Sequence, residues 1–295
     1  MLEYNAIKNL VDAAEKSGKK ISELVLEDQA QELEKTPQEV YDKMSKEFDV
    51  MQEAVKFGEQ KDQRSTSGLT GGEGYKMKAY NTASSGGLSG SLLVRAMGRA
   101  LAVAGCNASM GRIVAAPTAG SCGILPGCLI TMLEDRGLDR HAVVMSLFTA
   151  GAFGITIATN ASIAGAEGGC QAECGSAAGM AAAALVELAG GTPQMCADAC
   201  AMAINNQLGL VCDPVAGLVE IPCIKRNPSG VAIAFSAADM ALSGIQSAIP
   251  VDECIDAMRR VGHALPASLR ETAGGGLATT PTGLKLKEKV FGPEK

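Results

Sequence analysis

The sequence predicts a mostly α-helical protein built as a single large domain, with buried Gly- and Ala-rich helices joined by Gly/Ser loops. Hydrophobic residues make up 47% of the 295 residues, but aromatic residues make up only 3% and Trp is absent. The apolar residues are therefore mainly Ala, Leu, Met, Val and Ile, and the first three favour helix over strand. The 35 Gly indicate elements that pack closely. No series of β-branched strands alternates with helices, which argues against an α/β fold.

The first part of the chain, residues 1–62, is rich in Glu, Asp and Lys. Apolar residues such as Met44, Phe48 and Met51 recur within it at helical spacing, a pattern typical of amphipathic helices. We therefore expect N-terminal amphipathic helices over residues 1–62, followed by the main domain over residues 63–295.

Charge nearly vanishes between residues 142 and 250, and residues 142–166 carry no Asp, Glu, Lys or Arg. That segment is long enough to span a membrane. It contains Gly151, Gly154 and Gly165 and lacks an aromatic belt, so a buried helix of a soluble protein is the better interpretation. The sequence therefore predicts no membrane partner.

The overall charge and the N-terminus exclude other classes of protein. The net charge is -6 and the sequence pI is about 5.1, and no basic stripe occurs, so nucleic acid is not an expected partner. The N-terminus has no basic region followed by an apolar run, which predicts a cytoplasmic protein without a signal peptide. In that compartment the ten Cys are expected to be reduced.

Three polar, Gly-rich blocks interrupt the apolar sequence, at residues 84–90, 116–123 and 160–170. Runs of Ser, Thr and Gly ahead of helices present hydroxyl and backbone N–H groups, which suit a carboxylate ligand. Ordinary helix caps and close helix contacts are the alternative interpretation of each block.

The Cys residues do not make a strong metal site by their spacing alone. No Cys-x-x-Cys pair occurs, and zinc-finger and ferredoxin spacings are absent. Cys170 and Cys174 lie one helical turn apart. Cys212 and Cys223 differ in context, because Pro and Gly between them indicate a loop that leaves their thiols free to converge on a metal.

Four motifs together resemble a known family. They are SSGGLSG (residues 84–90), APTAGS (116–121), GAEGGCQAE (165–173) and the loop between Cys212 and Cys223. Over residues 64–285 the chain resembles the bacterial iron–sulfur L-serine dehydratases, specifically the α chain of the two-chain form. The motifs are long and distinctive. The resemblance implies a largely helical catalytic domain that converts L-serine to pyruvate and ammonia.

The family also implies a cofactor and its ligands. Three Cys hold a 4Fe–4S cluster in it, and the matching positions here are Cys170, Cys212 and Cys223. Three thiolates leave one iron free as a Lewis acid for the serine hydroxyl. The other seven Cys are then core or surface thiols. Donors for the serine carboxylate are expected in the first two blocks, at Ser84, Ser85, Gly86, Thr118, Ala119, Gly120 and Ser121.

The general base is left unassigned. His141 lies in a polar turn and His263 follows an amphipathic segment, so both are interpreted as structural. The two-chain form has a separate β subunit, which is a candidate source of the base and an expected partner. Some one-chain relatives end in a Cys that reaches the open iron, whereas this chain ends in Lys295.

Two rival functions remain open. A pyridoxal-phosphate serine/threonine dehydratase would need a Schiff-base Lys and a Gly-rich phosphate loop. Residues 274–276 are Gly-rich and resemble such a loop. However, Lys225 is the only Lys between Ala79 and Pro250, and its sequence context indicates an exposed turn and not a Schiff-base site. An iron–sulfur electron carrier or sensor is the second rival, and it predicts no serine turnover.

Overall fold

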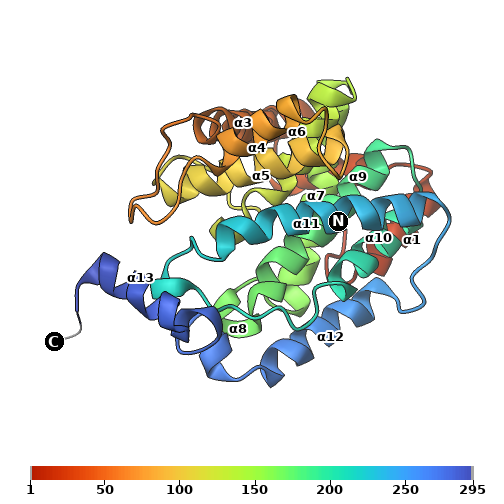
Figure 1. Ribbon diagram of the computed structural model, residues 1–295. Coiled ribbons are helices and arrows are strands. Elements are labelled where there is room, and N and C mark those ends of the chain that lie inside the picture. Colours follow the sequence, from red (N-terminus) through yellow and green to blue (C-terminus); the bar gives the residue numbers. More distant parts are fainter. Residues whose placement is uncertain (1, 294–295) are drawn as a thin grey trace.

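The computed structural model describes residues 2–293, which form one helical domain without a regular strand in that range (Figure 1). The α-helices are α1 (Ile7–Ser17), α2 (Ile21–Glu32), α3 (Pro37–Gly58), α4 (Glu73–Ala83), α5 (Ser91–Ala108), α6 (Ile124–Asp135), α7 (Arg140–Asn160), α8 (Gly165–Gly168), α9 (Ser176–Leu188), α10 (Pro193–Asn205), α11 (Cys223–Leu242), α12 (Val251–Ala264) and α13 (Pro281–Phe291). Short turns are η1 (Ala119–Ser121), η2 (Gln171–Gly175), η3 (Val215–Gly217), η4 (Ala267–Leu269) and η5 (Gly276–Thr279). The predicted helical fold class is confirmed.

Helix α9 lies at the centre of the domain, where α7, α10 and α11 pack against it. Every residue of α9 except the last is buried, and most of them are Ala, Gly or Ser. Small side chains let the helices approach closely: a Cβ on Gly179 would lie 2.9 Å from Cys200 Sγ, and one on Gly154 would lie 2.7 Å from Met180 Cε. The expected buried Gly- and Ala-rich helices are therefore present.

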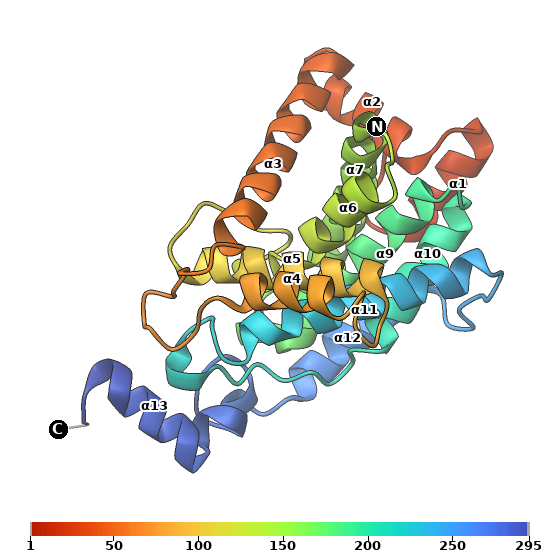
Figure 2. The same cartoon turned by 45° about the horizontal axis from the view of Figure 1, so that its top comes forward.

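A second group of helices surrounds α5, which contacts α3, α4, α6 and α11. Figure 2 shows α3 rising from this group at a steep angle to α4 and α5. A side chain at Gly58 would clash with Ala102 O, and one at Gly74 would lie 2.8 Å from Ala102 Cβ. These glycines let α3 and α4 meet the same turn of α5.

The N-terminal helices share the hydrophobic core of the rest of the chain. Ile7, Leu10, Val25 and Phe48 are buried within it, and α1, α2 and α3 pack on α10, α7 and α5 respectively. The division of the chain into amphipathic helices over residues 1–62 and a main domain over residues 63–295 stays a prediction.

Helix α7 contains most of the uncharged segment 142–166, which is long enough to span a membrane but which the sequence predicts to be a buried helix. It is the one helix among residues 2–293 that is long and apolar enough to cross a membrane, and 67% of its most apolar 18-residue window is buried. Helices α2, α3, α6 and α9 contact it. This burial is typical of a core helix.

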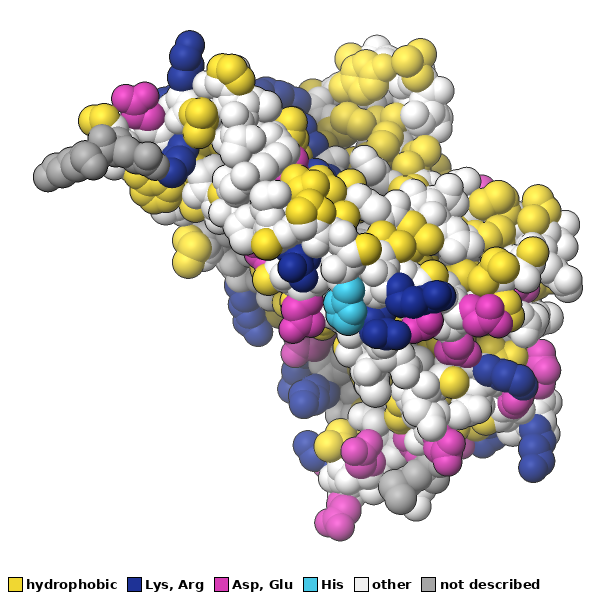
Figure 3. Space-filling view, turned by 90° about the horizontal axis from the view of Figure 1, so that it is seen from below, with side chains coloured by type: hydrophobic (Ala, Val, Ile, Leu, Met, Phe, Trp, Pro, Cys, Tyr) yellow, Lys and Arg dark blue, Asp and Glu magenta, His cyan; other side chains and the backbone are white. Residues whose placement is uncertain are grey.

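At the other end of the chain, α13 packs mainly on η3 and η5 and stands at the margin of the domain. Figure 3 shows this part as a projection that carries both hydrophobic and Lys/Arg side chains. The exposed apolar residues there are Leu277, Leu284 and Phe291.

Candidate active site

The site begins at a π-helical turn, η2, which joins Cys170 to α9. Such turns are rare and are frequent at functional sites. Gln171 is fully buried and fixes the turn: its Nε2 donates to Met258 O at 3.0 Å, and its Oε1 accepts from Gly209 N at 2.9 Å. The turn places Cys170 Sγ and Cys174 Sγ 3.7 Å apart.

Cys212 comes from a loop whose backbone is held on both sides. Its N–H donates to Leu269 O and its carbonyl accepts from Glu271 N, both at 2.8 Å. Arg226 donates to Val211 O at 2.8 Å and to Asp213 Oδ1 at 2.7 Å. These bonds fix the position of the Cys212 thiol.

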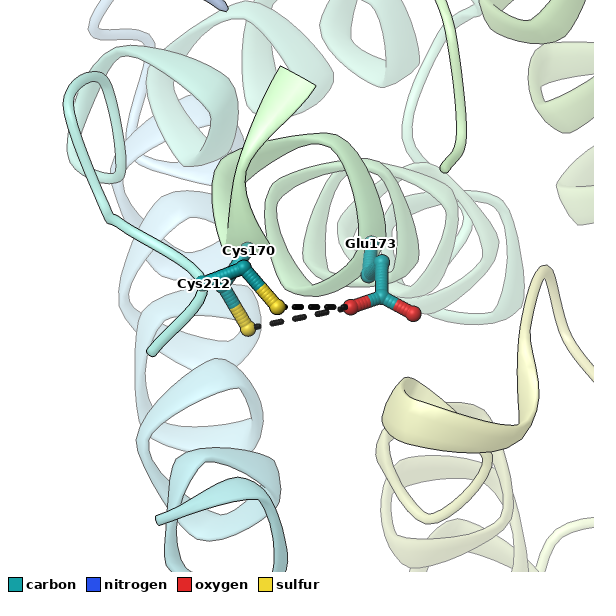
Figure 4. A group of neighbouring side chains, drawn as sticks. All are labelled: Cys170, Glu173 and Cys212. Carbon is teal, nitrogen blue, oxygen red and sulfur yellow. Dashed lines mark hydrogen bonds between the residues drawn. The ribbon is translucent and has the colours of Figure 1, made fainter. Parts of the chain in front are cut away.

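Two cysteines and one glutamate converge in the interior (Figure 4). The ligand atoms of Cys170, Glu173 and Cys212 all lie within 4.8 Å of one another, and the three residues are buried. Glu173 Oε2 is 4.0 Å from each of the two Sγ atoms. Cys212 is thus brought close to Cys170 across 42 residues of chain, and the role of these thiols as cluster ligands stays a prediction.

Cys223 is the first residue of α11 and is also buried. Burial, and then the charges of Cys170 and Glu173, raise the pKa of its thiol to about 12. The third predicted ligand therefore lies within electrostatic reach of the same groups, although it is outside the 4.8 Å group.

The acidic groups of the site affect one another strongly, and Arg226 supplies positive charge among them. Hydrogen bonds with Cys174 and Cys212, followed by the charge of Arg226, lower the pKa of Cys170. The interaction with Cys170 and burial raise the pKa of Cys212 far above its ordinary value. Burial, followed by the charge of Cys170, raises the pKa of Glu173 to about 7. Several acidic groups this close cannot all ionise in the protein interior unless a positive charge offsets their repulsion. The donor set, thiols plus one carboxylate, suits an iron or zinc centre.

The second polar block lies at this site. Thr118 Oγ1 donates to Glu173 Oε1 at 2.7 Å and lies 3.2 Å from Ser121 Oγ. Asn227, fully buried on α11, holds the loop: its Oδ1 accepts from Gly123 N at 2.8 Å, and its Nδ2 donates to Gly120 O at 2.9 Å. The loop with Thr118, Ala119, Gly120 and Ser121 is therefore next to the thiols.

The first polar block is not brought to this site. Ser84 and Ser85 are exposed, and Ser84 Oγ donates to Tyr80 O at 2.6 Å. Their loop precedes α5, whereas residues 116–121 follow it, so the two blocks lie at opposite ends of that helix (Figures 1 and 2). An 18-residue α-helix is about 27 Å long. The substrate role of Ser84, Ser85 and Gly86 stays a prediction.

Sequence reasoning did not single out Glu173 or Cys174. Glu173 lies within the GAEGGCQAE motif, three residues after Cys170, and that spacing places two residues on one helix face. Cys174 was assigned to the core thiols; it is fully buried, but its Sγ also contacts Cys170. Both histidines are exposed, and His141 packs on Tyr41 with ring centroids 4.7 Å apart.

Comparison with known proteins gives a consistent result. A family model described as "Serine dehydratase alpha chain" matches residues 16–278. The probable L-serine dehydratase, alpha chain, of Bacillus subtilis is 50% identical over 98% of this chain and 96% of its own length. The L-serine dehydratase, alpha chain, of Peptoniphilus asaccharolyticus is 44% identical over 96% of this chain and 97% of its own. The L-serine dehydratase of Mycobacterium tuberculosis is 47% identical over 61% of this chain, which covers 40% of that protein.

Proposed function

The chain belongs to the serine dehydratase alpha-chain family, and from this premise we propose that it converts L-serine to pyruvate and ammonia with a 4Fe–4S cluster and a β subunit. The convergence of Cys170, Glu173 and Cys212 in the interior, at positions of the family's motifs, carries the proposal. The proposal places the enzyme in the cytoplasm, where thiols stay reduced.

The residues present fit an iron–sulfur cluster. Cys170, Cys212 and Cys223 are buried thiols whose charges interact, and a cationic centre would relieve that repulsion. Gly165 leaves room there, because a Cβ on it would lie 3.0 Å from Cys212 Sγ. A cluster bound by three thiolates would supply a Lewis acid for the departing hydroxyl group of serine.

In this proposal the protein's own contribution is to bind and orient serine. Thr118 and Ser121 supply hydroxyl groups beside Glu173, and Ala119 and Gly120 supply the backbone between them. Asn227 anchors that backbone to α11, so the donors are held in place before serine binds. Such preorganised donors are worth more in a buried site than in water.

The loop of Ser84, Ser85 and Gly86, in which both serines are exposed, is the second proposed contact for the substrate carboxylate. This loop lies at the far end of α5 from the thiols, so the role requires it to move closer to the thiols than it lies in the structure. Ser85→Ala tests it through the KM for serine, and an unchanged KM contradicts the role.

The second subunit follows from the alpha-chain naming of the family and its relatives. We propose that a β chain docks over the site and supplies the base that removes the Cα proton. Both histidines of this chain are exposed. Within residues 2–293, neither forms a hydrogen bond with the thiols of the site. The base must come within roughly 3 Å of the proton-bearing carbon in the reacting complex.

The two rival functions have less support. Lys225, the residue a pyridoxal-phosphate enzyme would need for its Schiff base, is exposed on the first turn of α11. An electron carrier requires no polar loop beside its cluster, whereas the Thr118 hydroxyl lies directly at the site.

The proposal is tested by iron and sulfide analysis of anaerobically purified protein. Equal amounts of iron and sulfide, lost in Cys170→Ser, Cys212→Ser and Cys223→Ser together with serine turnover, are expected. The buried thiols Cys106 and Cys254 provide matched controls, and their Ser variants should keep both. Metal without sulfide, or full activity in Cys212→Ser, contradicts the proposal.

A further inference from the structure

Glu173 is a buried carboxylate that faces the thiols, and the proposal above assigns it no chemical function of its own. Its side chain is aimed into the group of cysteines (Figure 4), with Oε2 4.0 Å from the Sγ atoms of both Cys170 and Cys212. Its other oxygen, Oε1, accepts from Thr118 Oγ1 at 2.7 Å. One oxygen is therefore held in place, while the other lies beside the two thiols.

The backbone around this carboxylate is shaped to admit it. A Cβ on Gly120 would lie 2.9 Å from Glu173 Oε1, and a Cβ on Gly165 would lie 2.8 Å from Oε2. Neither glycine has a positive φ. Both are therefore needed for space and not for an unusual backbone conformation, and the space they leave lies around the carboxylate.

Arg226 is the cation that acts on Glu173, and its charge lowers the pKa of the carboxyl without forming an ion pair. Across residues 2–293, no Lys, Arg or His lies within salt-bridge distance of it. Arg226 is near, but its guanidinium donates to Val211 O and Asp213 Oδ1. A buried carboxyl group without an ion pair is either neutral or bound to a metal. The two thiols beside Glu173 are metal-ligand types, and their ligand atoms lie within 4.8 Å of its carboxylate, which favours the second option.

We propose that Glu173 is an oxygen ligand of the metal centre, which retains the iron that has no thiolate ligand. This inference rests on the proposed function, because it presumes a cluster on Cys170, Cys212 and Cys223. A carboxylate is a harder and more readily exchanged ligand for iron than a thiolate. Glu173 would therefore hold that iron in the resting enzyme and still leave its position accessible to serine. Thr118 then acts as a positioning residue, because it orients the carboxylate through Oε1.

The test uses the full α chain with its cluster assembled anaerobically, and compares wild type with Glu173→Gln. The amide keeps the shape of the side chain and removes its charge. We expect the variant to keep its sulfide but to release one iron to a chelator about tenfold faster or more. The three-iron form should also accumulate earlier on mild oxidation, as measured by electron paramagnetic resonance.

Glu167→Gln is the matched control, because Glu167 is an exposed carboxylate of the same motif. It should release iron at the wild-type rate. Equal rates in Glu173→Gln and wild type overturn the inference while leaving the proposed function intact. A wild-type chain that binds no sulfide overturns the proposed function and this inference with it.

A second variant covers the case in which Glu173→Gln assembles no cluster. Thr118→Val keeps the carboxylate and removes the hydrogen bond to Oε1. Faster iron release than wild type supports the inference, and an unchanged rate overturns it.

Discussion

Asn227 is the residue through which α11 holds the loop of residues 118–123, and replacing it should destabilise the protein strongly. It is fully buried and makes three side-chain hydrogen bonds, with Gly123 N, Gly120 O and Cys223 O. In Asn227→Ala the N–H of Gly123 and the carbonyl of Gly120 lose their partners, and both glycines are buried.

The expected cost follows from those two groups. A buried polar group left without a partner costs about 1–3 kcal/mol, so Asn227→Ala should lower the free energy of unfolding by about 2–6 kcal/mol. Asn227→Asp should cost at least as much. It can still accept from Gly123 N, but its second oxygen faces the carbonyls of Gly120 and Cys223, to which Asn227 donates.

Urea unfolding of the reduced apoprotein measures both variants. Asn206→Ala is the matched control, because Asn206 is exposed and donates only to Met202 O, so its change should stay within about 0.5 kcal/mol. A near-neutral Asn227→Asp beside a costly Asn227→Ala would refute the donor argument and leave only packing. Serine turnover should fall with the loss of the loop anchor in both Asn227 variants.

Four further outcomes are expected. Glu220→Ala should cost about 2 kcal/mol in urea unfolding, because Ser67 and Thr70 both donate to its carboxylate at 2.9 Å. Burial, and then the hydrogen bond to Asp28, raise the pKa of Tyr4. The neutral Tyr4 side chain therefore stabilises the folded protein below pH 10, and this contribution is lost as the pH rises above 10. Tyr4→Phe should flatten that loss in alkaline unfolding curves. Activity should decay in air and return with ferrous iron and a thiol reductant, and indifference to air and chelators would favour the pyridoxal-phosphate rival. Adding the β subunit to cluster-loaded α chain should raise turnover by orders of magnitude, and full activity of the α chain alone would place the base in this chain.

Composition and spacing were sufficient for the fold class because they report local preference and burial. Few aromatics and many Ala and Gly predict close-packed helices, and α9 with its buried small residues is such a helix. The uncharged segment 142–166 predicts burial, and α7 is largely buried. The packing of α1–α3 into the common core depends on contacts far along the chain, which periodicity does not encode.

The residues of the site could be predicted from the sequence only where they lie in a motif of the family. Cys170 and Cys212 converge as the family resemblance implied, yet spacing alone made no metal site of them. The sequence gives equal weight to the two Ser/Gly blocks, because both precede helices. The structure separates them by the length of α5, and only the loop with Thr118 and Ser121 meets the thiols. The π-helical turn that sets the 3.7 Å contact of Cys174 with Cys170 is not visible in the periodicity of the sequence.

The acidic residues left in the nearly uncharged stretch show why Glu173 is unusual among them. Four others are buried, and each binds a distant segment: Glu187 accepts from Ser22 N, Asp198 from Ser247 N, Asp213 from Leu277 N and Glu220 from Thr70 Oγ1. Each of these carboxylates satisfies donors that the fold would otherwise leave unpaired, so their burial has a structural explanation. Glu173 satisfies one such donor with Oε1, but its Oε2 faces two thiols, which are weak donors. Burying an ionised carboxylate oxygen against weak donors is costly, and a metal ion held by those same thiols would offset that cost.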